Sequence, residues 1–491
     1  MTATDHSFLT KPRQRLLIGD RWVDAVSGLT FESRNPATGE LLTTLAEGGE
    51  ADIDLAVAAA RQAFEHGPWA RMMPADRQML LLRIADLLEA RTESFALLDT
   101  LDMGKPIRFT RGSIPLLTSL LRYFAGMARA IHGDTPQPSI PGMFAATVKE
   151  PVGVCGAIIP WNGPLWASVL KIGPVLATGC TLVLKPAEDA SLTPLMFAEL
   201  CLESGVPPGV INIVTGPGTT AGAALAAHRD VDKLSFTGSD TTGRKIVQAA
   251  TGNLKRLSLE LGGKSPNIVF ADADLAAAAP AAAMAAFMSS GQVCSAGTRL
   301  YVERPIHDDF VAEVARAGAA LRLGDGRSED SDLGPLVSAR QLDRVTGYID
   351  KGLCEGARLI SGGARLAAPP FGDGFFLPPT VFADVADDMT IAREEIFGPV
   401  LSVMPFDDEE EVLHRANATP FGLGAGLWTS NVGRAHRMGG ALRAGSVWVN
   451  CYNALDPAVP SGGYKASGWG REYGPNHLDE HLNVKSLWIQ T

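Results

Sequence analysis

Apolar and polar positions follow two different periods along this chain, and the change of period separates helices from strands. Near the N-terminus, residues 16–33 predict a hairpin that turns at Gly19-Asp20. The next three segments carry apolar residues at the spacing of one helix face, and they cover 51–65, 75–101 and 111–131. We expect these helices to provide packing and no chemistry.

Short apolar runs alternate with helical patterns between Gly153 and Phe270. The expected strands cover 154–159, 181–184, 210–214, 233–236 and 266–270. The expected helices lie between them at 165–177, 194–204, 221–227 and 239–250. Such alternation predicts a doubly wound parallel sheet, whose ligands bind at the carboxyl ends of its strands.

A second α/β unit is predicted for residues 298–461. Its expected strands are 299–302, 401–405 and 446–449, and its expected helices are 308–321, 339–355, 408–416 and 431–442. Two further strands stand outside both units: 143–148, which follows a Pro-rich connector, and the alternating segment 482–490. The first predicts a protrusion, and the second has no partner next to it in sequence.

Composition narrows the class of protein. The chain has 491 residues, 46% of them hydrophobic, and a net charge of −11 without a basic stripe, which argues against nucleic acid and anionic membranes as partners. Its six cysteines show no CxxC spacing, which argues against a disulfide framework and a metal site. The N-terminal segment lacks an apolar signal region. We expect a soluble cytoplasmic protein.

One cysteine lies in a setting that suits a reacting thiol. In the segment 285–299, a run of small apolar residues turns polar and presents Cys294 between Gly291 and Gly297, where backbone can approach a ligand closely. A single cysteine is more often a buried structural residue, so the nucleophile hypothesis requires an activating partner elsewhere. The pattern alone leaves both interpretations open.

Two polar residues are candidate partners of this thiol. Glu260 ends an apolar strand before the Gly262-Gly263 turn, and a carboxylate in such surroundings is a candidate general base. Asn162, in the sequence Pro-Trp-Asn-Gly-Pro, can donate its amide N–H to a developing oxyanion. The alternative for Asn162 is an ordinary turn, the commoner role of asparagine beside proline and glycine.

Two glycine patterns are candidates for a phosphate site. Residues 216–221 match G-x-G-x-x-A, and residues 238–243 have the looser G-x-x-x-x-G. We favour the second, because Ser239 opens a helix whose free N–H groups can face a pyrophosphate. After the strand 181–184, Lys185 and Glu188 suit an adenosine ribose, and the carboxylate favours NAD over NADP. A solvated surface pair is the alternative.

Seven motifs follow one another in a recognisable order: PWNGP, LKPAE, FTGS, LELGGKSPN, GQVCSAGTR, EEIFGPV and GGYKASGWGRE. Together they resemble the NAD(P)-dependent aldehyde dehydrogenase superfamily over nearly the whole chain. The resemblance implies a cofactor-binding Rossmann-like domain from 1–132 and 152–261 and a catalytic α/β domain from 262–461. It also implies a small β oligomerisation arm from 133–151 and 473–491, and hence a homodimer or homotetramer.

The resemblance also implies roles for individual residues. Cys294 matches the nucleophile, Glu260 the base that activates the deacylating water, Asn162 the oxyanion amide, and Lys171 with Glu472 a proton-relay pair. The implied cofactor contacts are Ile159, Trp161, Lys185, Glu188, Gly218, Phe236, Gly238, Ser239, Gly243, Leu261, Glu395 and Phe397. The implied reaction is NAD-dependent oxidation of an aldehyde to a carboxylic acid through a thiohemiacetal and a thioester, and NADP is the less favoured cofactor.

The expected substrate pocket differs from the common family pattern. Its residues are Gly163, Trp166, Leu170, Met288, Val293, Ser295, Leu455 and Ser461. Four of these positions often carry aromatic residues in the family, so we expect a wide tunnel and a bulky hydrophobic aldehyde, aromatic or terpenoid, unless Trp166, Trp469 or Tyr452 fills the space. Three alternatives remain: a CoA-acylating semialdehyde dehydrogenase, a cofactor-independent cysteine hydrolase, and a non-catalytic structural protein on the same scaffold.

Overall fold

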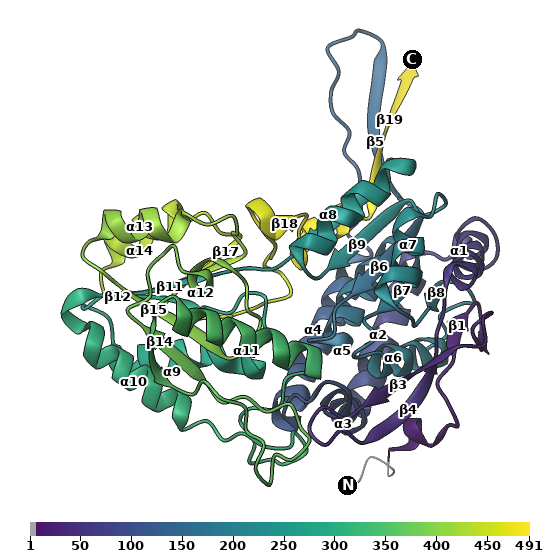
Figure 1. The fold of residues 1–491 in the computed structure, drawn as a ribbon. Coiled ribbons are helices and arrows are strands. Elements are labelled where there is room, and N and C mark those ends of the chain that lie inside the picture. Colours follow the sequence, from purple (N-terminus) through teal and green to yellow (C-terminus); the bar gives the residue numbers. More distant parts are fainter. Residues whose placement is uncertain (1–5) are drawn as a thin grey trace.

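Two sheets of mainly parallel strands organise the chain into two α/β lobes with a projecting β arm, as Figure 1 shows. The computed structural model describes residues 6–491, so the first five residues of the predicted segment 1–132 lie outside the described part. The α/β class with two doubly wound units, expected from the alternation of patterns, is confirmed.

The first sheet has eight strands in the order β18-β10-β9-β6-β7-β8-β1-β2. Their bounds are β1 Leu16–Ile18, β2 Arg21–Val23, β6 Val154–Ile159, β7 Thr181–Pro186, β8 Ile211–Ile213, β9 Lys233–Thr237, β10 Arg256–Glu260 and β18 Gly468–Trp469. The five central strands are parallel, whereas β1, β2 and β18 join antiparallel. The N-terminal hairpin is present as β1 and β2, and β3 (Thr30–Arg34) pairs separately with β4 (Leu41–Ala46).

Helices cover both faces of this sheet, so its central strands are apolar along their whole length. Every residue of β6 is buried; Cys155, Ala157 and Ile159 pack into one core, and Val154 and Ile158 pack into the other. The covering helices are α1 Glu50–Glu65, α2 Pro74–Ala90, α3 Thr92–Met103, α4 Ile107–Met127, α5 Pro164–Thr178, α6 Leu192–Glu203, α7 Ala223–Ala227 and α8 Asp240–Ala249. The apolar pattern at 75–101 forms two helices, because Arg91 leaves helical geometry between α2 and α3.

The second sheet has seven strands in the order β13-β14-β15-β12-β11-β16-β17, all parallel except β13. Their bounds are β11 Pro266–Val269, β12 Arg299–Glu303, β13 Arg358–Ser361, β14 Thr380–Ala383, β15 Val400–Phe406, β16 Gly424–Trp428 and β17 Ser446–Val449. Its helices are α9 Leu275–Phe287, α10 His307–Ala319, α11 Ala339–Cys354, α12 Thr390–Arg393, α13 Glu409–Asn417 and α14 Val432–Ala441. The pattern predicted no strand at β16, because two of its five residues are glycines.

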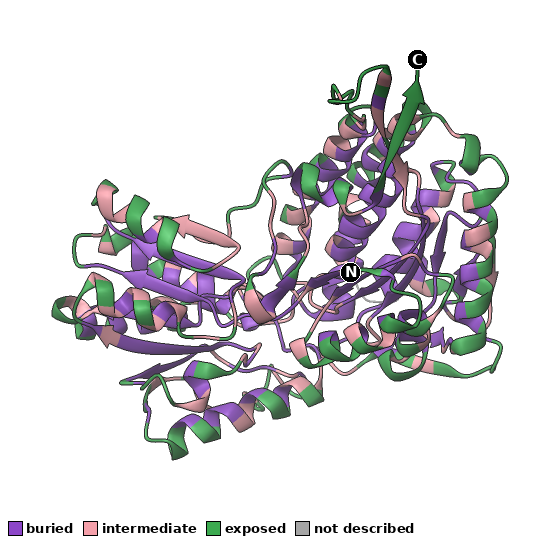
Figure 2. Cartoon of the chain, turned by 90° about the horizontal axis from the view of Figure 1, so that it is seen from above, coloured by how far each residue is buried: buried purple, intermediate pink, exposed green. Residues whose placement is uncertain are grey.

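The arm consists of two long strands that project from the first lobe (Figure 1). β5 (Met143–Pro151) pairs antiparallel with β19 (Leu482–Gln490) over the whole length of both strands, from Leu482↔Pro151 to Gln490↔Met143. The C-terminal strand, which has no neighbour in sequence, therefore finds its partner within the same chain. Nearly all of β19 is exposed, as Figure 2 shows, and Trp488 exposes 53% of its surface.

The last helix, α15 (Gly474–Asp479), packs against α5 of the first lobe. The C-terminal segment thus returns to the first lobe through β18 and α15 before it enters the arm. Among residues 6–491, no helix has both the length and the apolar character needed to cross a membrane.

Candidate active site

The chain passes from one lobe to the other directly after Glu260, and the predicted nucleophile lies at this crossing. β10 ends at Glu260 in the first sheet, and β11 begins the second sheet at Pro266. A Cβ placed on Gly263 of the connecting turn would lie only 2.7 Å from the backbone oxygen of Cys294. The turn therefore packs against the cysteine loop, and glycine is required for the contact.

The cysteine loop is held in one conformation by its own amide side chain. Ser289 and Ser290 have φ of 54° and 57°, left-handed values that non-glycine residues seldom adopt. Gln292 stabilises this backbone: its Nε2 donates to the Ser289 oxygen at 3.0 Å, and its Oε1 accepts from the Val337 N–H at 3.0 Å. Sequence reasoning missed Gln292, because its partners are set by the tertiary structure.

The thiol of Cys294 is half-buried and protonated at rest. Burial is the largest cause that raises its pKa to about 12, followed by the negative charges of Glu395 and Glu260, while a backbone hydrogen bond from Ser295 opposes them. A thiolate at this position requires a compensating positive charge or a nearby base, because the thiolate and not the thiol is the nucleophile.

Asn162 lies beside the cysteine loop. Its Nδ2 donates to the Gln292 backbone oxygen at 2.9 Å, two residues before Cys294, and its second N–H is available for another acceptor. Lys105 donates from Nζ to the Asn162 backbone oxygen at 3.2 Å and so fixes the loop that carries the amide. Lys105 is a second residue that no sequence pattern singled out.

Glu260 is a buried carboxyl group at the end of β10. Its Oε1 has no hydrogen-bond partner among the described residues, and a Cβ on Gly462 would lie 2.9 Å from it. Burial, together with the charge of Glu472, raises its pKa well above the ordinary range, while Lys171 and Arg471 lower it. The predicted pair Lys171 and Glu472 is present as a close ion pair, with only 3% and 14% of the two side chains exposed.

A second group of residues forms a cradle at the carboxyl ends of β7 and β9. Ser239 caps helix α8, and its Oγ accepts from the Thr242 N–H at 3.3 Å. A Cβ on Gly238 would lie 2.6 Å from the Phe236 ring, so only glycine allows the turn before the helix to pack this closely. A Cβ on Gly243 would meet Leu261 at 2.8 Å in the same way, whereas the exposed Gly218 faces open space.

Lys185 contacts the first of the two glycine patterns instead of pointing to solvent. Its Nζ donates to the Pro186 and Gly216 backbone oxygens at 2.5 and 2.8 Å, and it lies 3.7 Å from the Glu188 carboxylate. The Lys185 side chain is 2% exposed, whereas that of Glu188 is 39% exposed. The surface-pair alternative therefore fails for Lys185, and Glu188 is the member of the pair that can reach a ligand.

The second lobe contributes Glu395 and Phe397 to the edge of the same cradle. Glu395 Oε1 accepts from the Gly263 N–H at 3.1 Å, and burial raises its pKa to about 7. A Cβ on Gly262 would lie 2.2 Å from the other carboxylate oxygen. The ring of Phe397 meets that of Trp161 edge to face, with centroids 5.2 Å apart. Residues of both lobes thus converge beside the cysteine loop.

These groups fit a dinucleotide. The free N–H groups at the start of α8 suit a pyrophosphate, and the Glu188 carboxylate suits ribose hydroxyls. Ile159 is the last residue of the buried strand β6, directly before the loop that carries Trp161 and Asn162. No cluster of three or more histidine, cysteine, aspartate or glutamate side chains that could hold a metal ion occurs in the part of the chain from residue 6 onward.

The predicted pocket residues differ in their burial and in their hydrogen-bond partners. Trp166 donates from Nε1 to the Tyr473 hydroxyl at 2.7 Å, and Ser295 Oγ donates to Asn453 Oδ1 at 2.8 Å. Ser461 pairs with Glu472 through two backbone hydrogen bonds. Gly163 lies against Trp166, and Leu455 is 40% exposed. The others range from half-buried to buried, namely Met288, Val293 and Leu170.

All three aromatic residues considered as possible fillers of the pocket are held by hydrogen bonds, and that of Trp166 goes to the Tyr473 hydroxyl. Tyr452 donates from its hydroxyl to the Ser295 backbone oxygen at 2.9 Å and packs against Gly426 of β16. Trp469 is half-exposed and donates to the Leu257 backbone oxygen at 3.2 Å, next to β10. Trp166 remains as the aromatic residue beside Gly163.

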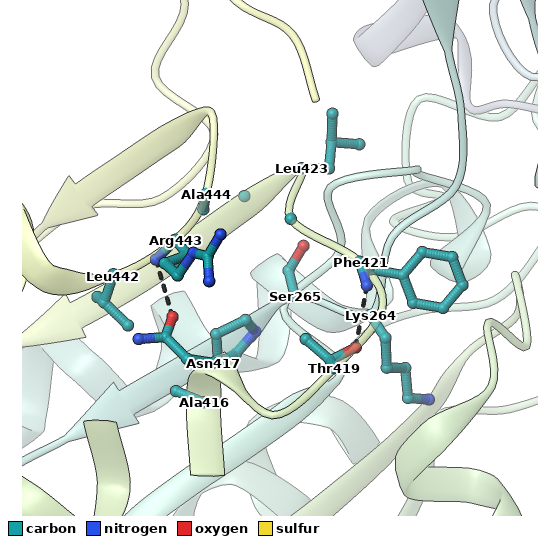
Figure 3. Close-up of a pocket in the computed structure, with 14 residues that line it drawn as sticks. Lys264, Ser265, Ala416, Asn417, Thr419, Phe421, Leu423, Leu442, Arg443 and Ala444 are labelled. Carbon is teal, nitrogen blue, oxygen red and sulfur yellow. Dashed lines mark hydrogen bonds between the residues drawn. The ribbon is translucent and has the colours of Figure 1, made fainter. Parts of the chain in front are cut away.

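Figure 3 shows a separate small cavity behind the Gly262-Gly263 turn, between Lys264–Pro266 and the loops around β16. Its free volume of about 10 Å³ is enough for one water molecule, and none of the predicted pocket residues lines it. Lys264 is buried here, its Nζ lacks a hydrogen-bond partner among the described residues, and burial lowers its pKa to about 7. This cavity is too small for an aldehyde.

Comparisons with known proteins agree with this geometry. The model of the Aldehyde dehydrogenase family matches residues 22–487. Human mitochondrial aldehyde dehydrogenase is 47% identical over 97% of this chain and 92% of its own length. The mitochondrial benzaldehyde dehydrogenase of Antirrhinum majus is 47% identical over 96% of this chain and 88% of its own.

A solved structure extends the likeness to the fold. The NAD+ complex of aldehyde dehydrogenase from Bacillus cereus superposes with a TM-score of 0.97 at 46% identity, and covers 100% of this chain and 99% of its own. Sequence and fold agree over nearly the full length of each relative. The chain therefore belongs to the aldehyde dehydrogenase family.

Proposed function

We propose that this enzyme oxidises an aldehyde to its carboxylic acid with NAD as the hydride acceptor. The observation that carries the proposal is the convergence, at the crossing between the lobes, of the Cys294 thiol, the Asn162 amide and the Glu260 carboxyl group. The dinucleotide cradle borders the same loop. NAD is favoured over NADP, because the accessible Glu188 carboxylate repels a 2′-phosphate.

The side chains divide the reaction into two stages. Cys294 Sγ gives its proton to water and attacks the carbonyl carbon, and the resulting alkoxide of the thiohemiacetal accepts hydrogen bonds from the Asn162 amide and the Cys294 backbone N–H. The alkoxide then re-forms the C=O bond while the C–H bond gives up its hydride, which leaves a thioester on Cys294; a bound nicotinamide ring would supply the hydride acceptor. Water then attacks the thioester carbon while its proton passes to Glu260, the C–S bond breaks, and the acid is released.

A CoA-acylating activity is the second candidate for this site. In that reaction, CoA takes the acyl group and no water needs activation, so the site has no use for a general base. The buried Glu260, with its raised pKa and an unpartnered oxygen within residues 6–491, favours hydrolysis.

Two variants test the proposal: the first tests the role of Cys294, which both candidate reactions require, and the second separates hydrolysis from acyl transfer to CoA. Cys294→Ala abolishes NADH formation. Glu260→Gln gives a rapid burst of up to one NADH per active subunit, followed by turnover slowed by about 100-fold or more, the usual contribution of a general base. Stopped-flow absorbance with and without CoA measures both. Full steady turnover of the Glu260 variant with CoA as acyl acceptor contradicts the hydrolytic proposal.

The substrate we propose is a bulky hydrophobic aldehyde, aromatic or terpenoid. The proposal is supported by the small or aliphatic residues at four predicted pocket positions, Gly163, Met288, Leu455 and Ser461, and by Trp469, which is hydrogen-bonded to Leu257 of β10. A relative that is 47% identical is named a benzaldehyde dehydrogenase. The comparison of kcat/KM for benzaldehyde and a terpenoid aldehyde with that for acetaldehyde tests this point, and a preference for acetaldehyde contradicts it.

The proposed assembly is a homodimer or homotetramer held by the arm. β19 presents Val484, Leu487, Trp488 and Ile489 to solvent at 45–64% exposure, and Phe144 of β5 is 44% exposed. Apolar side chains on a two-stranded ribbon favour association, because a long uncovered ribbon is prone to add partners. The proposed division assigns segments 133–151 and 473–491, which contain the two arm strands, to oligomerisation, 1–132 and 152–261 to the cofactor domain, and 262–461 to the catalytic domain.

A cytoplasmic location is also part of the proposal. The six cysteines are all free thiols, and three of them are buried in the cofactor lobe. A reducing compartment maintains such thiols. Fractionation of the native host, with activity measured in each fraction, tests the location.

A further inference from the structure

In the proposed reaction Glu260 gains a proton in every cycle, and its surroundings in the site make it bind that proton strongly. Burial and the Glu472 charge raise the pKa of Glu260 well above its ordinary range. Every hydrolysed thioester adds one proton to this carboxyl group, and the next turnover begins only after that proton has left. The Lys171–Glu472 ion pair beside Glu260 is the first group that can take it over.

Lys171 leads away from the active site into the first sheet. Its Nζ donates to Ser235 Oγ at 2.7 Å, where Ser235 belongs to β9. Ser235 pairs in register with Ser258 of the neighbouring strand β10. Paired residues of adjacent strands point to the same face of a sheet, so the two hydroxyl groups are neighbours on one face.

From Ser258, the row of polar groups continues to the surface. Lys233 Nζ donates to Ser258 Oγ, which in turn donates to Glu480 Oε2 at 3.0 Å. Lys233 Nζ also lies 3.5 Å from the same carboxylate oxygen. The Lys233 side chain is 1% exposed and that of Glu480 is 29% exposed, so the row begins in the buried site and ends at solvent.

The charges along this row alternate, and the groups packed around it are neutral or balanced. Lys171 and Lys233 are flanked by Glu472 and Glu480. His477 of α15 and His481, which follows this helix, face the two lysines, and burial with these positive neighbours lowers the pKa of both imidazoles, which leaves them uncharged. The Cys155 thiol also faces Lys233, but its hydrogen bond with Cys180 and its burial raise its pKa, so it is uncharged too. Arg471 faces Glu260 from the β18 side.

A purely structural role accounts for only part of this arrangement. A buried lysine requires a counterion, which explains the pairing of Lys233 with Glu480. It does not explain why Ser258, which is hydrogen-bonded to both members of the pair, is the register partner of Ser235, which accepts a hydrogen bond from the lysine beside the catalytic base. The charge of Glu480 is also among the causes that raise the pKa of Glu260, which places both carboxyl groups in one electrostatic network.

We infer that Ser235, Ser258, Lys233 and Glu480 are positioning residues that carry the proton of Glu260 from the Lys171–Glu472 pair to solvent at Glu480. The inference rests on the proposed function, because it assumes that Glu260 accepts a proton from the deacylating water. No oxidant or other reactant is involved: a proton leaves Glu260, a proton is released to water at Glu480, and the O–H and N–H groups between them each give one proton and receive one.

Two conservative variants test the inference. Ser235→Ala removes the hydroxyl group between Lys171 and Ser258, and Glu480→Gln removes the charge at the exit while it keeps an acceptor. Asp479→Asn is the matched control, because Asp479 is the adjacent exposed carboxylate and pairs with Lys149 at 2.8 Å, away from the row. Thermal unfolding of all three proteins checks that they are folded.

The measurement is the decay of the acyl-enzyme after one turnover, followed by quench-flow mass spectrometry from pH 6 to pH 10, because it isolates deacylation whichever step limits kcat. We expect both variants to slow this decay at least fivefold on the alkaline plateau, with the rate of NADH formation in the first turnover unchanged. A small buffer such as imidazole restores the decay, because it replaces the missing proton carrier.

The sign of the pH effect is a further check. Glu480 raises the pKa of Glu260, so Glu480→Gln moves the acid limb of deacylation to lower pH. The inference is overturned if Ser235→Ala and Glu480→Gln both show the same deacylation rate on the alkaline plateau as Asp479→Asn and the same change of this rate when imidazole is added. That result would leave the proposed function intact. The proposed function is contradicted by a different result: the parent enzyme forms no NADH from any aldehyde, or Glu260→Gln turns over normally.

Discussion

The protonation state of Cys294 offers the most direct test of the site. Its pKa of about 12, caused first by burial and then by the charges of Glu395 and Glu260, compares with about 8.5 for an unperturbed thiol. That difference reduces the thiolate fraction at pH 7 by about 3,000-fold. A more basic thiolate is intrinsically more reactive, which raises its exchange rate by roughly 30-fold and offsets part of this loss. Thiol–disulfide exchange at Cys294 is therefore expected to be about 100-fold slower than at an ordinary exposed cysteine.

The assay is exchange with dithiodipyridine in the absence of cofactor, followed residue by residue with mass spectrometry. Cys354 and Cys451 are exposed and serve as internal references in the same sample. The rate at Cys294 should rise about tenfold per pH unit up to pH 10, because the thiolate fraction does so below the pKa. Glu395→Gln, assayed at pH 9 where Glu395 is ionised, should raise the rate, and Glu394→Gln should not.

The comparison of the two glutamates isolates the electrostatic cause. Glu395 is half-buried against the Gly262-Gly263 turn, whereas Glu394 is exposed and accepts a hydrogen bond from the Tyr348 hydroxyl at 2.7 Å. If Cys294 exchanges at pH 7 as fast as Cys354, or if its rate levels off below pH 9, the account of the resting thiol is wrong.

Three further predictions follow from the same contacts. Asn162→Ala should lower kcat by 100- to 1,000-fold, the usual loss for one oxyanion donor, with stability measured by urea unfolding little changed; a loss below tenfold contradicts the assigned role. Gly262→Ala places a methyl group 2.2 Å from a Glu395 oxygen and should raise KM for NAD at least tenfold, whereas Gly252→Ala, which meets nothing within 4 Å, should not. Trp488→Ser with Ile489→Ser should lower the mass seen by light scattering, since both side chains are about half-exposed on the arm; an unchanged mass refutes that role for β19.

Local pattern determined a large part of this structure. Strands such as β6 are buried on both faces, and their continuous apolar runs made the parallel first sheet predictable. Cys294 and Glu260 were recognisable as candidates because glycines stand beside them, and glycines mark places where the backbone approaches another group closely. The strand β16 was not recognisable, because its small residues carry no period of their own.

Only the tertiary structure decided how these residues act together. Glu260 and Cys294 are 34 positions apart in sequence, yet both lie at the Gly262-Gly263 turn because two sheets meet there. Gln292 gained its role from partners around residue 337, and Lys233 gained its role from Glu480, which the C-terminal helix brings across the sheet. A side chain's residue type fixes the chemistry it can perform, whereas its burial and the charges around it, which set its pKa, depend on segments that only folding brings together.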